Sequence, residues 1–191
     1  NFNVQVNGAT LVITAASPTA IDYGGTKASD TFTATGLNAA DSITGITYTY
    51  TGSGATIYGP TTTAPTAAGS YTITPSAVTF ADAASAAKYS TITYNTGLFT
   101  INKKALTVTP TNQDIVYGAT AAISFGVTGF ATIGGTLESA ATAAGYTSPT
   151  CAVSTYSVTS NAGTTLTINC SGGLANNYTF TTTATATATV S

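Results

Sequence analysis

The sequence predicts an all-β protein built from two tandem antiparallel modules, and two observations indicate this fold class. The first is the alternation of threonine with apolar residues along most of the chain, which carries 45 threonines among 191 residues. Alternate side chains of a strand point to opposite faces of a sheet, so this pattern is typical of half-buried strands. The second is an internal repeat that relates the first half of the chain to the second.

Each predicted strand combines threonine with aliphatic or aromatic residues at every second position. Clear examples are residues 46–50, 71–74, 99–101, 106–109 and 184–190. Threonine is β-branched and favours an extended backbone, and glycine pairs such as Gly24-Gly25 separate the strands as turns. Only the alanine-rich residues 80–88 have the composition of a helical turn. Many short strands at this spacing predict a sandwich or a barrel.

The internal repeat defines two modules. The matching segments are 21–26 with 115–120, a spacing of 94 positions, and 88–90 with 177–179. We expect module 1 to span residues 1–101 and module 2 residues 102–191. The polar joint at residues 102–104 is too short to be a flexible linker, so we expect the modules to lie end to end.

The composition excludes most kinds of chemistry. The chain has four Lys and Arg, six Asp and Glu, no His and two Cys. The six carboxylates are scattered along the sequence, so we expect no catalytic group, no bound metal and no cofactor, and therefore no enzyme. A net charge of −2 predicts no nucleic-acid partner. No apolar run approaches the ~18 residues that cross a membrane, so we expect no membrane insertion.

The two cysteines bracket a predicted hairpin whose tip lies near residues 160–161. The expected cross-strand pairs are Cys151 with Cys170, Val153 with Ile168, and Thr155 with Leu166, all on one face. Without His neighbours or CxxC spacing, Cys151 and Cys170 form either a disulfide or two buried thiols. We expect the disulfide, and with it an extracellular location, secreted or on the cell surface.

The two Tyr-Gly pairs, Tyr23-Gly24 and Tyr117-Gly118, are interpreted as structural. We expect each tyrosine to close one end of its module. Each glycine is expected to adopt a positive φ angle that a β-carbon would disfavour. The alternative is a platform on which these tyrosines stack against sugar.

The first eight residues alternate polar side chains with Phe2, Val4 and Val6 and precede the first repeat. They therefore form an expected extra strand, residues 1–8, without an assigned partner. Such a strand could pair with the sheet edge of a neighbouring subunit and give head-to-tail growth. Alternatively, it closes a preceding module or pairs within its own module.

Several of these segments resemble the bacterial immunoglobulin-like repeats known as MBG or YDG-type modules. The resemblance rests on the opening strand 104–109, the Tyr-Gly pair, the turn and strand 163–168, the Asn-Asn-Tyr segment 176–178 and a threonine-rich closing strand. It covers module 2 well and module 1 more loosely. It implies that both modules are immunoglobulin-like antiparallel β-sandwiches. It also implies a place among the stalk units of large secreted adhesins, which carry no catalytic residues.

Together these features predict a non-catalytic structural unit of an extracellular bacterial surface fibre, filament or adhesin stalk. We expect it to assemble end to end, with itself or with neighbouring modules. The alternative is an adhesin module that binds carbohydrate or another surface through exposed Tyr and Thr side chains.

Overall fold

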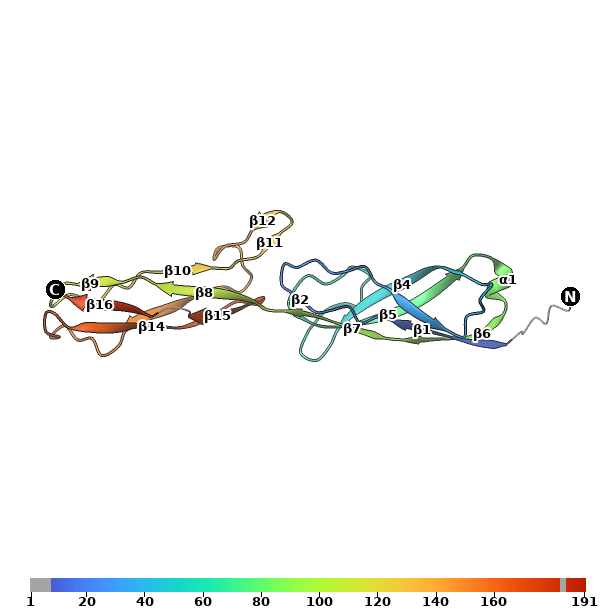
Figure 1. Cartoon of the computed structure of the whole chain (residues 1–191), viewed down its shortest axis with the longest axis horizontal. Coiled ribbons are helices and arrows are strands. Elements are labelled where there is room, and N and C mark those ends of the chain that lie inside the picture. The colour runs from blue at the N-terminus through green and yellow to red at the C-terminus, as the bar shows by residue number, and fades with distance from the viewer. Residues whose placement is uncertain (1–7, 183–184) are drawn as a thin grey trace. The chain divides into compact units, whose positions relative to one another are not determined.

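The computed structural model describes residues 8–182 and 185–191, and over these residues the protein is all-β (Figure 1). The chain divides into two compact units, unit 1 from Asn1 to Asn102 and unit 2 from Lys103 to Ser191. In the described part of the chain, no helix is long and apolar enough to cross a membrane.

The described residues of unit 1 form a three-stranded sheet, a four-stranded sheet and one helical turn. The elements are β1 (Ala9–Ala15), β2 (Ile21–Asp22), β3 (Phe32–Thr35), β4 (Ile43–Gly52), β5 (Gly69–Phe80), α1 (Ala83–Ala86), β6 (Tyr89–Asn95) and β7 (Gly97–Asn102). The sheet orders are β3-β1-β6 and β2-β7-β5-β4. The helix α1 lies within the predicted segment 80–88, where the Asp82 carboxylate caps it by accepting from the Ser85 N–H at 2.7 Å.

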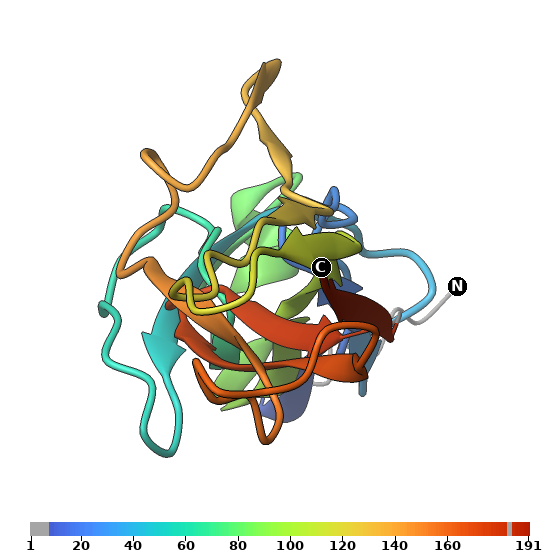
Figure 2. The same cartoon turned by 90° about the vertical axis from the view of Figure 1, so that its left-hand side faces the viewer.

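Unit 2 repeats this arrangement and adds a small hairpin. Its elements are β8 (Lys104–Pro110), β9 (Gln113–Ile115), β10 (Phe125–Thr128), β11 (Thr132–Ile133), β12 (Thr136–Leu137), β13 (Thr147–Val153), β14 (Thr165–Leu174), β15 (Tyr178–Thr182) and β16 (Ala186–Val190). The sheet orders are β10-β8-β15 and β13-β14-β16-β9. The added hairpin β11-β12 projects away from these two sheets in both views (Figures 1 and 2).

The expectation of purely antiparallel sheets is wrong, because each unit contains a mixture. Among the described strands, β1 lies parallel to β6 and β2 to β7, while β8 lies parallel to β15 and β9 to β16. The cause is the opening segment of each unit. It runs first along one sheet and continues in the other, where it meets the closing strand running in the same direction. Alternation of side chains has the same period in parallel and antiparallel pairs, so the sequence pattern could not distinguish them.

The alternation places the aliphatic residues of each unit in its core. Leu11 and Ile13 of β1 are fully buried, as are Leu106 and Val108 of β8. Each such side chain contributes roughly 1.5–3 kcal/mol by leaving water. In unit 1 the core cluster joins β1 and β6 to side chains of β4 and β5, so the two sheets share one core.

One glycine after the third strand of each unit is required by the backbone. Gly36 follows β3 and Gly129 follows β10, with φ angles of 86° and 100°. A β-carbon on Gly129 would lie 2.8 Å from the Ala105 carbonyl oxygen, and one on Gly36 would clash with the Thr10 carbonyl oxygen. Only glycine can adopt this backbone conformation and also allow so close an approach of the neighbouring strand, β1 in unit 1 and β8 in unit 2.

Candidate functional site

No metal-binding cluster of side chains is found within the described residues. No three of the His, Cys, Asp and Glu side chains there gather closely enough to hold a metal ion. Several charged groups make structural contacts instead. The features of interest are a disulfide, a tyrosine–carboxylate contact that recurs in both units, the Tyr-Gly pairs and an apolar pocket.

In unit 1, a buried carboxylate ties the loop after β3 to the start of β6. The Asp41 side chain is 1% exposed and accepts from Lys88 at 2.5 Å, from the Tyr89 hydroxyl at 2.7 Å and from the Ser85 hydroxyl at 3.1 Å. The bonds from Lys88 and Tyr89 hold the Asp41 pKa below its usual value, and the bond to Asp41 raises the Lys88 pKa. The Tyr89 hydroxyl also accepts the Asn38 N–H at 2.9 Å. The Asp41 carboxylate, the Lys88 ammonium and the Tyr89 hydroxyl therefore all have hydrogen-bond partners within the fold.

Unit 2 contains the same contact with different residues. The Tyr178 hydroxyl accepts the Ala131 N–H at 2.9 Å and donates to the Glu138 carboxylate. Tyr89 and Tyr178 occupy matching places in the repeat, but sequence reasoning did not identify their partners. The hairpin β11-β12 lies between Ala131 and Glu138, and this insertion shifts the acidic residue out of the repeat spacing. The match of residues 88–90 with 177–179 was the signal that pointed to the tyrosines.

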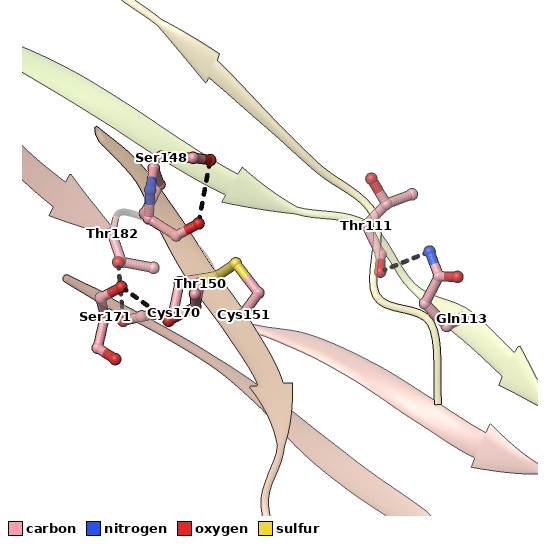
Figure 3. The surroundings of a disulfide bond; sticks show 9 residues. Thr111, Gln113, Ser148, Thr150, Cys151, Cys170, Ser171 and Thr182 are labelled. Carbon is pink, nitrogen blue, oxygen red and sulfur yellow. Dashed lines mark hydrogen bonds between the residues drawn. A yellow bond between two sulfur atoms is a disulfide. The ribbon is translucent and has the colours of Figure 1, made fainter. Parts of the chain in front are cut away.

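The predicted disulfide joins β13 to β14 (Figure 3). The Cys151 and Cys170 sulfur atoms are bonded, with an S–S distance of 2.00 Å and a Cα–Cα distance of 4.0 Å. Beside it the Thr150 hydroxyl donates to the Ser171 carbonyl at 3.4 Å. The Thr182 hydroxyl of β15 reaches the Cys170 carbonyl at 3.5 Å. Because β15 belongs to the other sheet of unit 2, this contact links the two sheets beside the disulfide.

The predicted register of this hairpin is confirmed at two pairs and wrong at the third. Cys151 lies opposite Cys170 and Val153 opposite Ile168. Thr155 does not pair with Leu166, because β13 ends at Val153 and Thr155 has a φ of 59°, which turns the chain away. Leu166 lies instead opposite Ala188 of β16.

In the two Tyr-Gly pairs, the glycines share one backbone conformation, whereas the tyrosines differ in their exposure to solvent. Gly24 and Gly118 both have the expected positive φ, at 85° and 80°. Tyr23 is buried as expected, at 7% exposure, whereas Tyr117 is 58% exposed and does not close its unit. The backbone contact is nevertheless repeated: the Tyr23 N–H donates to Asn102 and the Tyr117 N–H to Ser191, at 2.9 and 2.8 Å. The motif therefore places the last residue of each unit beside its Tyr-Gly turn.

An apolar pocket of about 320 Å³ lies in unit 2 between β13 and the segment before β10. Its lining residues are Thr120, Ala121, Ile123, Cys151, Ala152, Val153, Tyr156, Ser157 and Val158, and they include no charged group. The Tyr156 hydroxyl donates to the Ala119 carbonyl, so its polar end is satisfied. A pocket with an uncharged, largely apolar lining suits an apolar side chain.

Two further expectations concern the strand donors at the N-terminus and the tyrosines as a sugar-binding surface. Phe2, Val4 and Val6, the expected strand donors, lie outside the described residues. Among the eleven tyrosines, Tyr117 alone is exposed, so the tyrosines do not gather into a surface for sugar stacking.

Comparison with known proteins gives no relative: no protein family, no curated protein and no solved structure matches this chain. The class that fold and contacts define is an all-β protein with one disulfide, divided into two compact units.

Proposed function

We propose that this protein is a non-catalytic structural unit of an extracellular bacterial surface fibre and assembles end to end. Its two units are immunoglobulin-like β-sandwich modules of the MBG or YDG type in this proposal. Support comes from the composition, from the buried core that the two sheets of unit 1 share, and from the satisfied polar groups described above. A protein of this kind acts through shape and cohesion.

The observation that carries the proposal is the path of the chain through each unit. The first strand of unit 1 begins at Ala9, beside Tyr89, and the closing residue Asn102 lies beside Asp22 at the far end of the opening segment. The first strand of unit 2 likewise begins at Lys104, beside Tyr178, and the last strand ends with Val190 beside Ile115. A unit that takes the chain in at one end and releases it at the other suits a series of units under tension.

The disulfide supports an extracellular location. Disulfides persist in oxidising compartments and are rare where thiols are kept reduced. Cys151 and Cys170 make a structural cross-link between neighbouring strands of one sheet, where reduction would serve no evident chemistry. A secreted or surface-exposed chain is consistent with this cross-link.

The alternative, a module that binds carbohydrate, gains no support from the tyrosines. A sugar platform requires neighbouring aromatic faces open to solvent, and Tyr117 is the one exposed tyrosine. We therefore keep structural assembly as the proposed function.

Electron microscopy of the purified full chain tests the proposal. We expect fibres whose repeat matches a series of such units. A matched variant of the same length, with Phe2, Val4 and Val6 all changed to Asn, should remain monomeric if residues 1–7 add a strand to a neighbour. A wild-type chain that stays monomeric in sedimentation at all accessible concentrations would reject the proposal.

A further inference from the structure

The space around Lys27, Tyr50 and Phe99 of unit 1 has a counterpart in unit 2 that is filled by different side chains. In unit 1, the Lys27 ammonium lies 5.3 Å from the centre of the Tyr50 ring and 5.6 Å from that of the Phe99 ring. Lys27 pairs with Asp30 at 2.5 Å, and the Tyr50 hydroxyl donates to the same carboxylate. Tyr50 is 3% exposed and Phe99 is 1% exposed. Two aromatic rings and the Lys27 side chain therefore fill this place in unit 1.

Unit 2 has smaller side chains at all three positions. The repeat spacing and the strand registers give the corresponding pairs: Lys27 and Ala121, Tyr50 and Val153, Phe99 and Ala188. The Tyr156 ring packs against the core of unit 2 and occupies part of the space that these smaller side chains leave. The remaining volume is the pocket of about 320 Å³, and it opens to solvent beside Val158, which is 51% exposed.

The strand edges at this place differ as well. In unit 1 the segment 53–68 folds back over the outer edge of β4. Tyr50 and Thr61 exchange backbone hydrogen bonds of 2.8 and 3.1 Å, and the Gly52 N–H donates to the Tyr58 carbonyl at 2.9 Å. Unit 1 thus covers this edge with its own chain, which removes a site for strand addition.

In unit 2 the corresponding segment, residues 154–164, is five residues shorter. Among the described residues, the backbone ladder of β13 is with β14 alone, and β13 is the last strand of its sheet. The outer edge of β13 and the apolar pocket therefore lie next to one another without the cover that unit 1 supplies. An open edge of this kind is a template for an added strand.

We propose that this edge and pocket of unit 2 receive residues 1–7 of a second copy as an added strand, with the Phe2 ring in the pocket. This inference rests on the proposed function and names its acceptor site. The segment alternates Phe2, Val4 and Val6 with polar residues and contains no charged side chain. That pattern matches a strand with one face on an apolar pocket and the other in water.

The dimensions of the segment and the acceptor agree. Seven residues of extended chain span about 23 Å at ~3.3 Å each, and β13 is also seven residues long. A cavity of ~150 Å³ is sufficient to hold benzene, so the pocket of about 320 Å³ admits the Phe2 ring. In unit 1 the same place is occupied by aromatic rings.

The donor segment and the acceptor are two different surfaces of the chain. The pocket segment 120–123 follows Tyr117-Gly118, which lies beside Ser191 at the closing end of unit 2. Residues 1–7 precede Gly8 at the opening end of unit 1, where Gly8 and Ala9 donate to the Lys88 carbonyl. Contact between two different surfaces is a head-to-tail contact, which extends into a filament where successive copies do not close into a ring.

Photo-crosslinking of the full chain tests this site directly. Phe2 is replaced by p-benzoylphenylalanine in a mixture of ¹⁴N-labelled and ¹⁵N-labelled chains. After irradiation, mass spectrometry is expected to join position 2 to residues 120–123 or 151–158, with half of the linked pairs carrying mixed labels. Links to other segments, or links within one copy only, would overturn the inference.

A pair of matched variants provides the second test. Val158→Asp places a charge at the mouth of the pocket, whereas Leu174→Asp places one on β14 at a side chain that is 71% exposed. Both positions are exposed, so both variants should fold. We expect Val158→Asp to raise the concentration for half-assembly by about tenfold or more, because strand addition would then bury the charge, and Leu174→Asp to change it little.

The outcomes separate this inference from the proposed function. If wild type forms fibres and Val158→Asp forms them equally well, the acceptor lies elsewhere and end-to-end assembly stands. If wild type remains monomeric, both proposals fail together. Fibres with the expected cross-links and a selective defect in Val158→Asp support both.

Discussion

Tyr89 and Tyr178 show how single residues stabilise a protein with few charges. Each hydroxyl accepts a backbone N–H from the loop after the third strand of its unit and donates to a carboxylate. A buried tyrosine without such partners would lose roughly 1–3 kcal/mol for each unsatisfied polar group. The contact therefore anchors the loop of each unit while the ring fills the core.

Acid should weaken unit 1 through Asp41. Because its pKa is lowered in the fold, its contribution is present above the unfolded value near 4 and is lost as the pH falls through the folded value. The contribution of Lys88, whose pKa is raised, is lost at the opposite extreme, as the pH rises through the folded value. We expect Asp41→Asn to lower the Tm at pH 7 by several degrees and to lower it far less at pH 2, measured by circular dichroism.

The control for this prediction is Asp22→Asn, at an exposed residue of β2. It should leave the Tm nearly unchanged at both values of pH. Equal Tm losses for Asp41→Asn at pH 7 and pH 2 would show that the ionised carboxylate contributes nothing.

At the scale of elements, the β13-β14 hairpin shows how far the sequence could predict the structure. The alternation predicted the face of each residue, and a turn expected near residues 160–161 predicted the register that pairs Cys151 with Cys170. The hairpin could not be followed to Thr155, because its positive φ leaves no mark in the alternation. The parallel pairs and the apolar pocket depend on partners far away in the sequence, so no local pattern predicted them.

The disulfide should stabilise unit 2 and leave unit 1 unaffected. It closes a loop with a sequence separation of 19 within unit 2, which corresponds to about 3 kcal/mol in the chain-entropy description. We expect the double variant Cys151→Ala with Cys170→Ala to lose about that much free energy of unfolding in urea. Tyrosine fluorescence can follow the unfolding of both units, because each unit contains tyrosines and the chain has no tryptophan.

Addition of reductant to the wild type supplies the matched comparison. It should shift the unfolding of unit 2 as the double variant does and have no effect on the variant itself. A variant as stable as wild type would mean that the cross-link contributes nothing in the folded or the unfolded state.

At the scale of the whole molecule, the two units share one strand arrangement but differ at the outer edge of the four-stranded sheet, β4 in unit 1 and β13 in unit 2. Both have the same order of strands in the two sheets, the same glycine after the third strand and the same tyrosine contact. Unit 1 covers the outer edge of β4 with its own segment, whereas in unit 2 no described residue covers the outer edge of β13. In the proposed assembly, the outer edge of β13 is the acceptor of each copy and residues 1–7 are its donor, so each copy contacts one neighbour through each surface.

Assembly by this route should depend little on salt. Neither the pocket nor residues 1–7 contains a charged side chain, and Lys27 and Lys88 are paired within unit 1. Raising NaCl from ~20 to ~500 mM shortens the screening length from roughly 20 Å to roughly 4 Å, yet the half-assembly concentration should change by less than about threefold. Ammonium sulfate should lower that concentration, because it strengthens apolar burial. Light scattering of the full chain across both salts measures the effect, and a tenfold loss of assembly in NaCl would show that charge pairs hold the copies together.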